Sequence, residues 1–228
     1  MSLGVVISLC DLTGNMVRPW AEAGYECWCV DVQHSIRKTR TISVGRGVIH
    51  FVWGDIRTFR RPTRKPISFV IIQSPCTHTA VSGARDFATK GGMMLRDALE
   101  MFEAGRQIAD WSGAPWMQEN PVTMLSSIPH LGKPNHYFHP WEYAGYCADD
   151  NYTKKTSIWC GNGFVMPEKC PAPHLGEPDN RIHFASPADD RADIRSAAPM
   201  GFAIAVFRAN APACYVAALD REQNKDVA

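Results

Sequence analysis

The chain has almost no net charge and no long hydrophobic run. Its 228 residues carry 24 Lys and Arg against 23 Asp and Glu, which gives a formal net charge of +1 at pH 7. A near-neutral protein has no strong general attraction to polyanions, so any nucleic-acid surface must be local. No segment approaches the length of a membrane span, and the first residues lack a basic region followed by an apolar stretch. We expect a cytoplasmic protein that contacts no membrane.

The eight cysteines form no Cys-x-x-Cys pair. Cys170 and His174 have a plausible spacing for zinc ligands, but without such a pair the sequence does not favour a metal site. Thiols in or near apolar runs are typical of reduced, buried cysteines, so a disulfide framework is not expected either. Four cysteines belong to this inert class: Cys10, Cys27, Cys29 and Cys214.

Apolar runs alternate with helical patterns through the first half of the chain. The patterns predict strands at 5–9, 25–32, 48–53, 67–74, 116–119 and 156–160. They predict helices at 16–23, 93–111 and 197–211. Trp111 and Trp116 are expected in the core. Strands that alternate with helices predict an α/β fold, in which helices cover a mostly parallel sheet.

Two of these strands end in groups that can perform chemistry. Residues 67–74 lead into Pro75-Cys76 and a small polar loop, and the strand from Trp116 ends on Glu119. Because open α/β sheets bind ligands at the carboxyl ends of their strands, Cys76 and Glu119 predict a nucleophile beside an acid. A Cys-His hydrolase built on Cys76 and His78 is disfavoured, since near neighbours on a short loop seldom form a dyad and no oxyanion motif is evident.

Ser74-Pro75-Cys76, followed by Glu119-Asn120-Pro121 and preceded by a Gly-containing first turn, resembles the motifs of the DNA cytosine-C5 methyltransferases. The resemblance runs from about Val5 to Pro212. It implies a Rossmann-like S-adenosylmethionine-dependent methyltransferase fold, with S-adenosyl-L-methionine as cofactor and DNA as partner. In this interpretation the Cys76 thiolate adds to cytosine C6, C5 attacks the donor's methyl group, and Glu119 donates a proton at ring N3.

The same resemblance implies cofactor contacts from several regions. The turn at 10–15 resembles the family's first motif, Asp31 its ribose-binding acid, and Asp55 the acid that recognises the adenine amino group. Residues 195–199 resemble the last motif, which returns to the cofactor pocket. The expected cofactor-binding residues are Leu12, Thr13, Gly14, Asn15, Asp31, Val32, Asp55, Ile56, Pro75, Arg195 and Ser196.

Two segments depart from the family's pattern. Residues 152–156 are similar in position to a Gln-x-Arg-x-Arg segment that touches the base and backbone, but Lys154 and Lys155 replace arginines, and either could reach the base. Arg195 stands where Asn is usual. A guanidinium beside a sulfonium is unfavourable, whereas a donor with an added carboxylate would suit it. Carboxymethyl transfer from carboxy-S-adenosyl-L-methionine, with Arg195 binding the carboxylate, is therefore an open alternative.

A separate target-recognition domain does not fit the length of the chain, because only about 35 residues separate Cys160 from Arg195. We expect one catalytic domain over 1–219, with an irregular insert at about 161–195, and a polar tail over 220–228. Short or absent sequence specificity follows, with the target base flipped into the Cys76 pocket. The basic segment 56–65 is either a phosphate-binding loop or a solvated one.

A compact, monomeric enzyme of this kind would suit a phage or mobile element, acting in the cytoplasm of a bacterium or an infected host. Two other classes stay open. A non-catalytic DNA-binding relative is expected to lack Cys76 or Glu119, and the chain has both. An enzyme that modifies free nucleotides would show no dependence on polymeric DNA.

Overall fold

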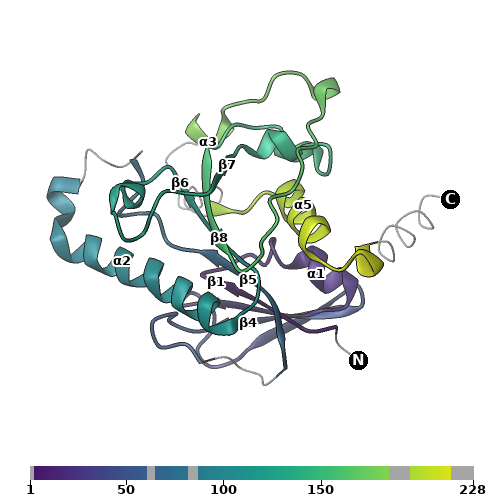
Figure 1. Ribbon diagram of the computed structural model, residues 1–228, viewed down its shortest axis with the longest axis horizontal. Helices are drawn as coiled ribbons and strands as arrows, with labels where there is room; N and C mark the ends of the chain where they lie inside the picture. Colours follow the sequence, from purple (N-terminus) through teal and green to yellow (C-terminus); the bar gives the residue numbers. More distant parts are fainter. Residues whose placement is uncertain (1–2, 61–64, 82–86, 185–195, 217–228) are drawn as a thin grey trace.

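The computed structural model describes residues 3–60, 65–81, 87–184 and 196–216, and the predicted polar tail at 220–228 lies outside these ranges. An eight-stranded sheet crosses the fold, with helices on both faces (Figure 1). The strands are β1 (Val5–Leu9), β2 (Glu26–Asp31), β3 (Arg40–Val44), β4 (Gly47–Trp53), β5 (Ile67–Gln73), β6 (Trp116–Pro121), β7 (His136–Phe138) and β8 (Thr156–Gly161). The α-helices are α1 (Arg18–Ala23), α2 (Phe87–Ser112), α3 (Arg181–Phe184) and α5 (Met200–Asn210). Short 3-10 helices are η2 (Met124–Ser127), η3 (Pro140–Tyr143), η4 (Ala148–Asp150) and η5 (Pro173–Leu175).

Five neighbouring strands run parallel, in the spatial order β4-β2-β1-β5-β6. From β1 the chain steps to β2 and β4 on one side, and then crosses back to β5 and β6 on the other. The order therefore reverses between β1 and β5, which is the switch point where open α/β sheets bind ligands. The predicted α/β class, a mostly parallel sheet flanked by helices, is confirmed.

Antiparallel strands complete both sides of the sheet. β3 pairs with β4, β8 pairs with β6, and β7 pairs with β8. Because β8 runs opposite to β6, the start of β8 lies at the carboxyl edge, where Thr156 is the register partner of Pro121. The segment before β8 is thereby brought beside the residues that end β6.

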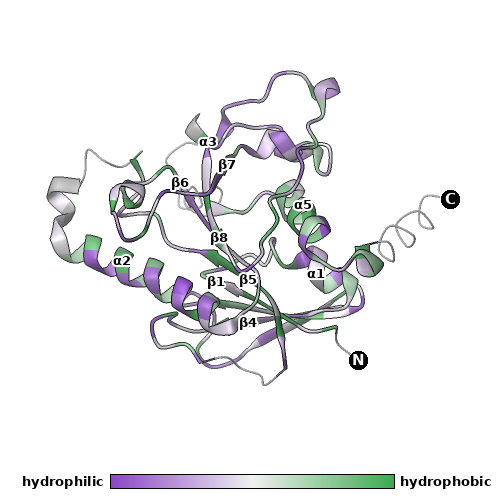
Figure 2. Ribbon diagram, in the orientation of Figure 1, coloured by the Kyte–Doolittle hydropathy of each residue, from purple (hydrophilic) through white to green (hydrophobic). Residues whose placement is uncertain are grey.

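Side chains of the inner strands alternate between two cores, one on each face of the sheet. Phe69 of β5 packs with α1 and α5, and its ring stacks on that of Trp20 with centroids 5.0 Å apart. Val70, the next residue, packs in the second core with Phe102 of α2. Strands buried on both faces are continuous apolar runs, which explains why β5 was evident from sequence. Figure 2 shows the hydrophobic residues in the central strands and hydrophilic residues on α2 and the loops.

Two strands, β3 and β7, were not predicted. β3 is an edge strand whose residues are largely exposed, so it lacks the apolar alternation that marks a strand. Its turn into β4 uses Gly45, which has a φ of 54°, and a Cβ there would lie 2.6 Å from the Glu22 Cα. β7 has three residues and is defined by pairing with the distant β8. Neither signal is readable from a local pattern.

Some burial predictions were wrong. Trp111 is 71% exposed at the end of α2, whereas Trp116 is buried as predicted. Helical spacing does not fix which face of a terminal turn meets the sheet. Cys27 and Cys29 are buried as predicted, but Cys10 is partly buried and Cys214 is exposed. None of the helices in the described ranges is both long enough and apolar enough to cross a membrane.

A carboxylate from η4 holds the start of α5. Asp150 is buried, and its Oδ2 accepts a hydrogen bond of 2.6 Å from the backbone N–H of Gly201, in the first turn of α5. Asp150→Ala would leave that N–H without its partner, so we expect the free energy of unfolding to fall by about 1–2 kcal/mol. Urea denaturation measures the change. Asp150→Asn keeps an acceptor oxygen and is expected to lose less, and equal losses would contradict the capping role.

Candidate active site at the carboxyl edge of the sheet

A buried carboxylate shapes the turn that follows β1. Asp11 is 1% exposed, and its Oδ1 accepts hydrogen bonds from the backbone N–H groups of Thr13 (3.0 Å) and Gly14 (2.7 Å). Its Oδ2 accepts a hydrogen bond of 2.7 Å from the Ser8 hydroxyl. Gly14 has a φ of 75°, which favours glycine at this position. Asp11 was not among the predicted cofactor-binding residues, although an Asp followed by Thr and Gly after a strand is a turn signal.

Predicted cofactor residues from distant parts of the chain lie beside this turn. Asn15 Nδ2 donates a hydrogen bond of 3.1 Å to the Ala198 carbonyl, so the segment that contains Ser196 returns to the end of β1. Asp31 ends β2, is 8% exposed, and accepts a hydrogen bond of 2.8 Å from the Gln33 N–H. The structure therefore brings the 12–15 turn, Asp31 and the 196–199 segment to one edge of the sheet. Val32 follows Asp31 and is exposed.

The end of β4 carries a second acid in a different setting. Asp55 forms an ion pair with Arg57, whose Nη2 lies 2.6 Å from Oδ2 and whose Nε lies 2.9 Å from Oδ1. Hydrogen bonds from this guanidinium lower the pKa of Asp55. Ile56 is buried in the core that contains α2. The contact of Asp55 and Ile56 with adenine stays a prediction, and Arg57 would have to share Asp55 with that ligand.

The loops that follow β5 and β6 are bonded to one another. The Val81 N–H donates to the Val122 carbonyl at 3.0 Å, and the Thr123 hydroxyl donates to the Thr79 carbonyl at 2.9 Å. Cys76 lies in the first of these loops and Glu119 lies near the end of β6, where its register partner is Gln73, three residues before Cys76. The predicted thiol and acid therefore lie at adjacent strand ends next to the switch point.

Polar side chains behind Cys76 fix the end of β5. Asn120 Nδ2 donates a hydrogen bond of 2.8 Å to the Ser74 carbonyl, and Gln118 Nε2 donates one of 2.8 Å to the Ser74 hydroxyl. Arg106 of α2 donates in turn to Gln118 Oε1 at 3.1 Å. Asn120 and Gln118 are fully buried. These three hydrogen bonds hold the end of β5 at Ser74, although the buried Asn120 Oδ1 has no hydrogen-bond partner among the described residues.

Glu119 is half-buried, and burial raises its pKa. The charge of Lys154 opposes this effect and lowers the pKa. Tyr152, the first residue of the predicted 152–156 segment, is buried, and its pKa is raised by burial first and then by the charges of Asp150 and Glu119. A raised pKa keeps a carboxyl group protonated to a higher pH, as a proton donor requires.

The two candidate lysines point to different surroundings. Lys154 acts on Glu119, whereas the Nζ of Lys155 lies 4.9 Å from the centroid of the Tyr137 ring, which is 48% exposed. Adjacent residues entering a strand face opposite sides of the sheet, which accounts for the separation. Of the two lysines, Lys154 is therefore the one whose charge lowers the pKa of Glu119.

Several predicted features lie outside the described residues. Arg195 is among them, so its proposed contact with a carboxylated donor stays a prediction.

Within the part of the chain that the structure describes, no group of three or more His, Cys, Asp or Glu side chains could hold a metal ion. Two surface hollows of about 630 and 480 Å³ lie along α2 and share Arg57 and Asp110, and neither is lined by Cys76 or Glu119.

Comparisons with known proteins gave one kind of match. No family model matches the sequence, and no curated protein matches it. Among solved structures, the chain is similar to a proposed DNA modification methyltransferase encoded within an E. coli prophage, with 13% sequence identity and a TM-score of 0.46. The match covers 69% of this chain and 46% of that protein, so the chain spans less than half of its length.

Proposed function

We propose that the chain is a DNA cytosine-C5 methyltransferase that uses S-adenosyl-L-methionine. The observation that carries the proposal is the hydrogen bonding between the loop that contains Cys76 and the residues that follow Glu119 and β6, beside the switch point of the sheet. A thiol and a protonated carboxyl are the two groups that activation of cytosine requires. The strand order, with an antiparallel pair beyond β6, is also that of the methyltransferase fold which the sequence resembles.

The residues at the ends of β1, β2 and β4 suit the cofactor. When bound, S-adenosyl-L-methionine supplies an electrophilic methyl group. The turn at 12–15, with Pro75 and Ser196 beside it in the family's arrangement, would hold the methionine part. Asp31 would accept hydrogen bonds from the ribose hydroxyls, next to Val32, and residues 55–56 would hold the adenine. Asp11 supports this assignment because its buried carboxylate holds the backbone N–H groups of Thr13 and Gly14 and so fixes the conformation of the turn.

The proposed chemistry uses two side chains. The Cys76 thiolate forms a bond to cytosine C6, while Glu119 gives its proton to N3. The ring would become an enamine whose C5 attacks the donor's methyl carbon, so that the bond between this carbon and the donor sulfur breaks and the donor leaves as the neutral thioether S-adenosyl-L-homocysteine. A water molecule would then take the C5 proton, the electrons of that bond would form the C5–C6 double bond again, and the bond between C6 and sulfur would break to release the Cys76 thiolate. N3 would return its proton to the Glu119 carboxylate. Burial supports this role of Glu119, since it favours the neutral acid at the start.

DNA is the proposed partner of a monomer, and the target base would flip out of its stack to reach Cys76. The described part of the insert, residues 162–184, is mostly irregular apart from η5 and α3. This supports short or absent sequence specificity. Lys154, beside Glu119, would contact the flipped base, and Lys155 would contact the strand outside the pocket.

Mass spectrometry of nucleosides tests the proposal. DNA incubated with the protein and S-adenosyl-L-methionine is digested, and a gain of one methyl group on cytosine is expected. The same assay with carboxy-S-adenosyl-L-methionine tests the carboxymethyl alternative, and with free deoxycytidine monophosphate it tests a free-nucleotide substrate. No mass gain under any of these conditions would overturn the proposal in favour of a non-catalytic relative.

Asp11→Ala tests the donor site. The substitution removes the acceptor that holds two backbone N–H groups, and a hydrogen bond to a charged group contributes about 1.5–3 kcal/mol. We expect affinity for S-adenosyl-L-methionine to fall about 10-fold to 100-fold, measured by isothermal titration calorimetry. Circular dichroism confirms that the variant is folded. Unchanged affinity would show that the donor does not bind at the β1 turn.

A further inference from the structure

We propose that Arg181 and Asp179 of the insert are positioning residues for Lys154. The inference rests on the proposed function, because it gives the insert a role in placing the lysine that meets the flipped base. Neither residue touches the reacting atoms in this proposal. Both act through residues 149–153, the segment that leads into β8.

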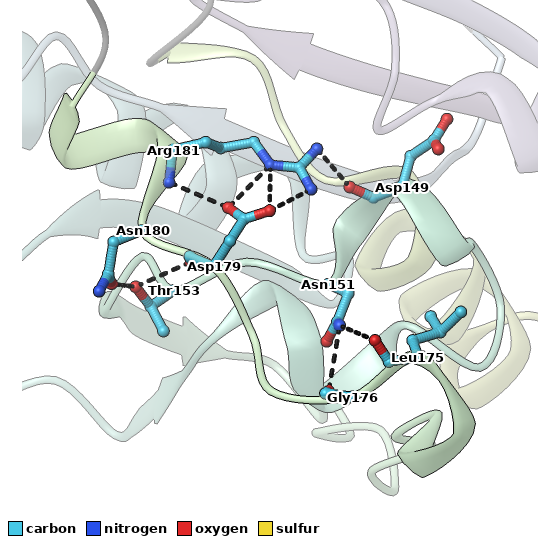
Figure 3. A network of polar contacts seen from close by, with 8 residues as sticks. All are labelled: Asp149, Asn151, Thr153, Leu175, Gly176, Asp179, Asn180 and Arg181. Carbon is cyan, nitrogen blue, oxygen red and sulfur yellow. Dashed lines mark hydrogen bonds and ion pairs between the residues drawn. The ribbon is translucent and has the colours of Figure 1, made fainter.

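Arg181 and Asp179 form a closed set of contacts (Figure 3). The Nε of Arg181 donates to both oxygens of the Asp179 carboxylate at 2.8 Å, its Nη2 pairs with the same group, and its backbone N–H donates to Oδ1 at 2.9 Å. The Nη1 of Arg181 reaches the Asp149 carbonyl at 3.3 Å, and the guanidinium lies 5.6 Å from the centre of the Tyr152 ring. One side chain therefore joins the insert to both ends of the 149–152 segment.

The backbone of Asp179 extends the same connection. Its N–H donates to the Asn151 carbonyl at 3.2 Å, and its carbonyl accepts from the Thr153 N–H at 2.8 Å. These bonds make a parallel bridge between Tyr152 and Asp179. The Thr153 hydroxyl also donates to Asn180 Oδ1 (Figure 3). The residue directly before Lys154 is thus held by the insert.

Lys154 is held on its other side by the strand. The Thr156 hydroxyl donates a hydrogen bond of 3.1 Å to the Lys154 carbonyl, and Thr156 pairs with Pro121 of β6. The Lys154 backbone is therefore held on both sides next to the end of β6, and Glu119, whose pKa the lysine lowers, lies two residues before Pro121. Among the described residues, Lys154 and Tyr152 interact electrostatically with Glu119.

A purely stabilising role does not explain this arrangement well. The side chains of Arg181 and Asp179 are 52% and 47% exposed, and ion pairs at such exposure contribute little to stability. Their contacts instead converge on residues 149–153, and the next residue, Lys154, is the one whose charge lowers the pKa of the proposed acid Glu119. The positioning role therefore predicts an effect on Glu119 that exceeds the effect on folding.

The test measures the titration of the Glu119 carboxyl by carbon-13 NMR on the full chain, with the signal assigned from Glu119→Gln. Lys154→Met removes the opposing charge, so the Glu119 pKa is expected to rise. Arg181→Ala and Asp179→Asn are expected to raise it in the same direction, and Arg181→Ala combined with Lys154→Met is expected to add nothing further. Arg181→Lys keeps the charge but not the forked geometry, so it is expected to behave like Arg181→Ala. Arg96→Ala, which breaks an exposed pair with Glu100 on α2, is the matched control and should change nothing.

Two outcomes would overturn the inference: a Glu119 pKa in Arg181→Ala equal to that of the wild-type chain, or shifts that add fully in the double variant. The titration does not depend on activity, so it is separate from the test of the proposed function. If cytosine is methylated, kcat/KM of Arg181→Ala for DNA should also fall about 10-fold, because small misplacements of a binding group lower the rate. Urea denaturation of each variant excludes unfolding as the cause.

Discussion

With Cys76 replaced by Ala, cytosine methylation is expected to fall by at least about 10³-fold in kcat, which is typical of the loss of a catalytic nucleophile. Without the thiolate, C6 has no partner and C5 does not become nucleophilic. The Ser74 carbonyl and its partner Asn120 are untouched by the change, so the loops should keep their places. Single-turnover transfer of a radiolabelled methyl group to DNA measures the loss.

Cys214→Ala is the matched control, because Cys214 is an exposed thiol remote in sequence from the site. It should retain wild-type activity, and Cys76→Ala should retain wild-type affinity for S-adenosyl-L-methionine. DNA that contains 5-fluorocytosine tests the bond between the Cys76 sulfur and C6 directly. Fluorine at C5 is not lost as a proton is, so the elimination that releases the cysteine is blocked. The wild-type chain should become linked to this DNA and Cys76→Ala should not. Retention of a tenth of the activity in Cys76→Ala would rule out Cys76 as the nucleophile.

Glu119→Gln is expected to lower kcat by about 10²-fold to 10⁴-fold, the usual contribution of a general acid. The amide has nearly the same shape and can donate a hydrogen bond, but it does not transfer a proton to N3. Binding of DNA should therefore change less than kcat. Comparison of kcat with the dissociation constant for DNA separates the two effects, and an equal loss in both would show that Glu119 only binds the base.

The pH dependence has a defined sign. Burial raises the pKa of Glu119, and the donor is the protonated form, so activity should decline as the pH rises through this raised pKa. Lys154→Met removes the charge that lowers the pKa, so the decline should move to higher pH. Lys155→Met is the control, because Lys155 lies over the Tyr137 ring, and it should leave the decline in place. If the pH–activity profile of Lys154→Met equals that of the wild-type chain, the charge of Lys154 does not affect the Glu119 pKa.

The parts of the fold that sequence analysis predicted are those with strong local patterns. β5 and β6 are apolar runs that end in chemistry-bearing residues, and their pairing follows from the parallel α/β pattern. Cys76 and Glu119 lie at the ends of neighbouring strands, as the sequence pattern predicted, and their catalytic roles stay a proposal. The long helix α2 was evident from its spacing, with Phe102 on its buried face.

The parts that were missed depend on contacts between distant residues. Asp11 acts through backbone N–H groups that any residue would supply, so its type alone did not mark it. The choice between Lys154 and Lys155 required the direction of β8, which is set by pairing with β6. The proposed role of Arg181 and Asp179 depends on their contacts with residues 149–153, which lie 26 to 32 residues earlier in the chain.

The reversed direction of β8 also bears on how the protein could be enlarged. β8 ends at the amino edge of the parallel strands. The connection that follows β8 must therefore return along the length of the strands to the carboxyl edge, where Asp179 meets Thr153. This return path is a surface strap, and the entropy of closing such a loop grows only slowly with its length. Extra residues inserted between Gly161 and Asp179 would extend from this surface connection and would leave the ends of β5 and β6 in place. The connection between Gly161 and Asp179 is thus a position at which a domain with its own DNA sequence specificity could be inserted.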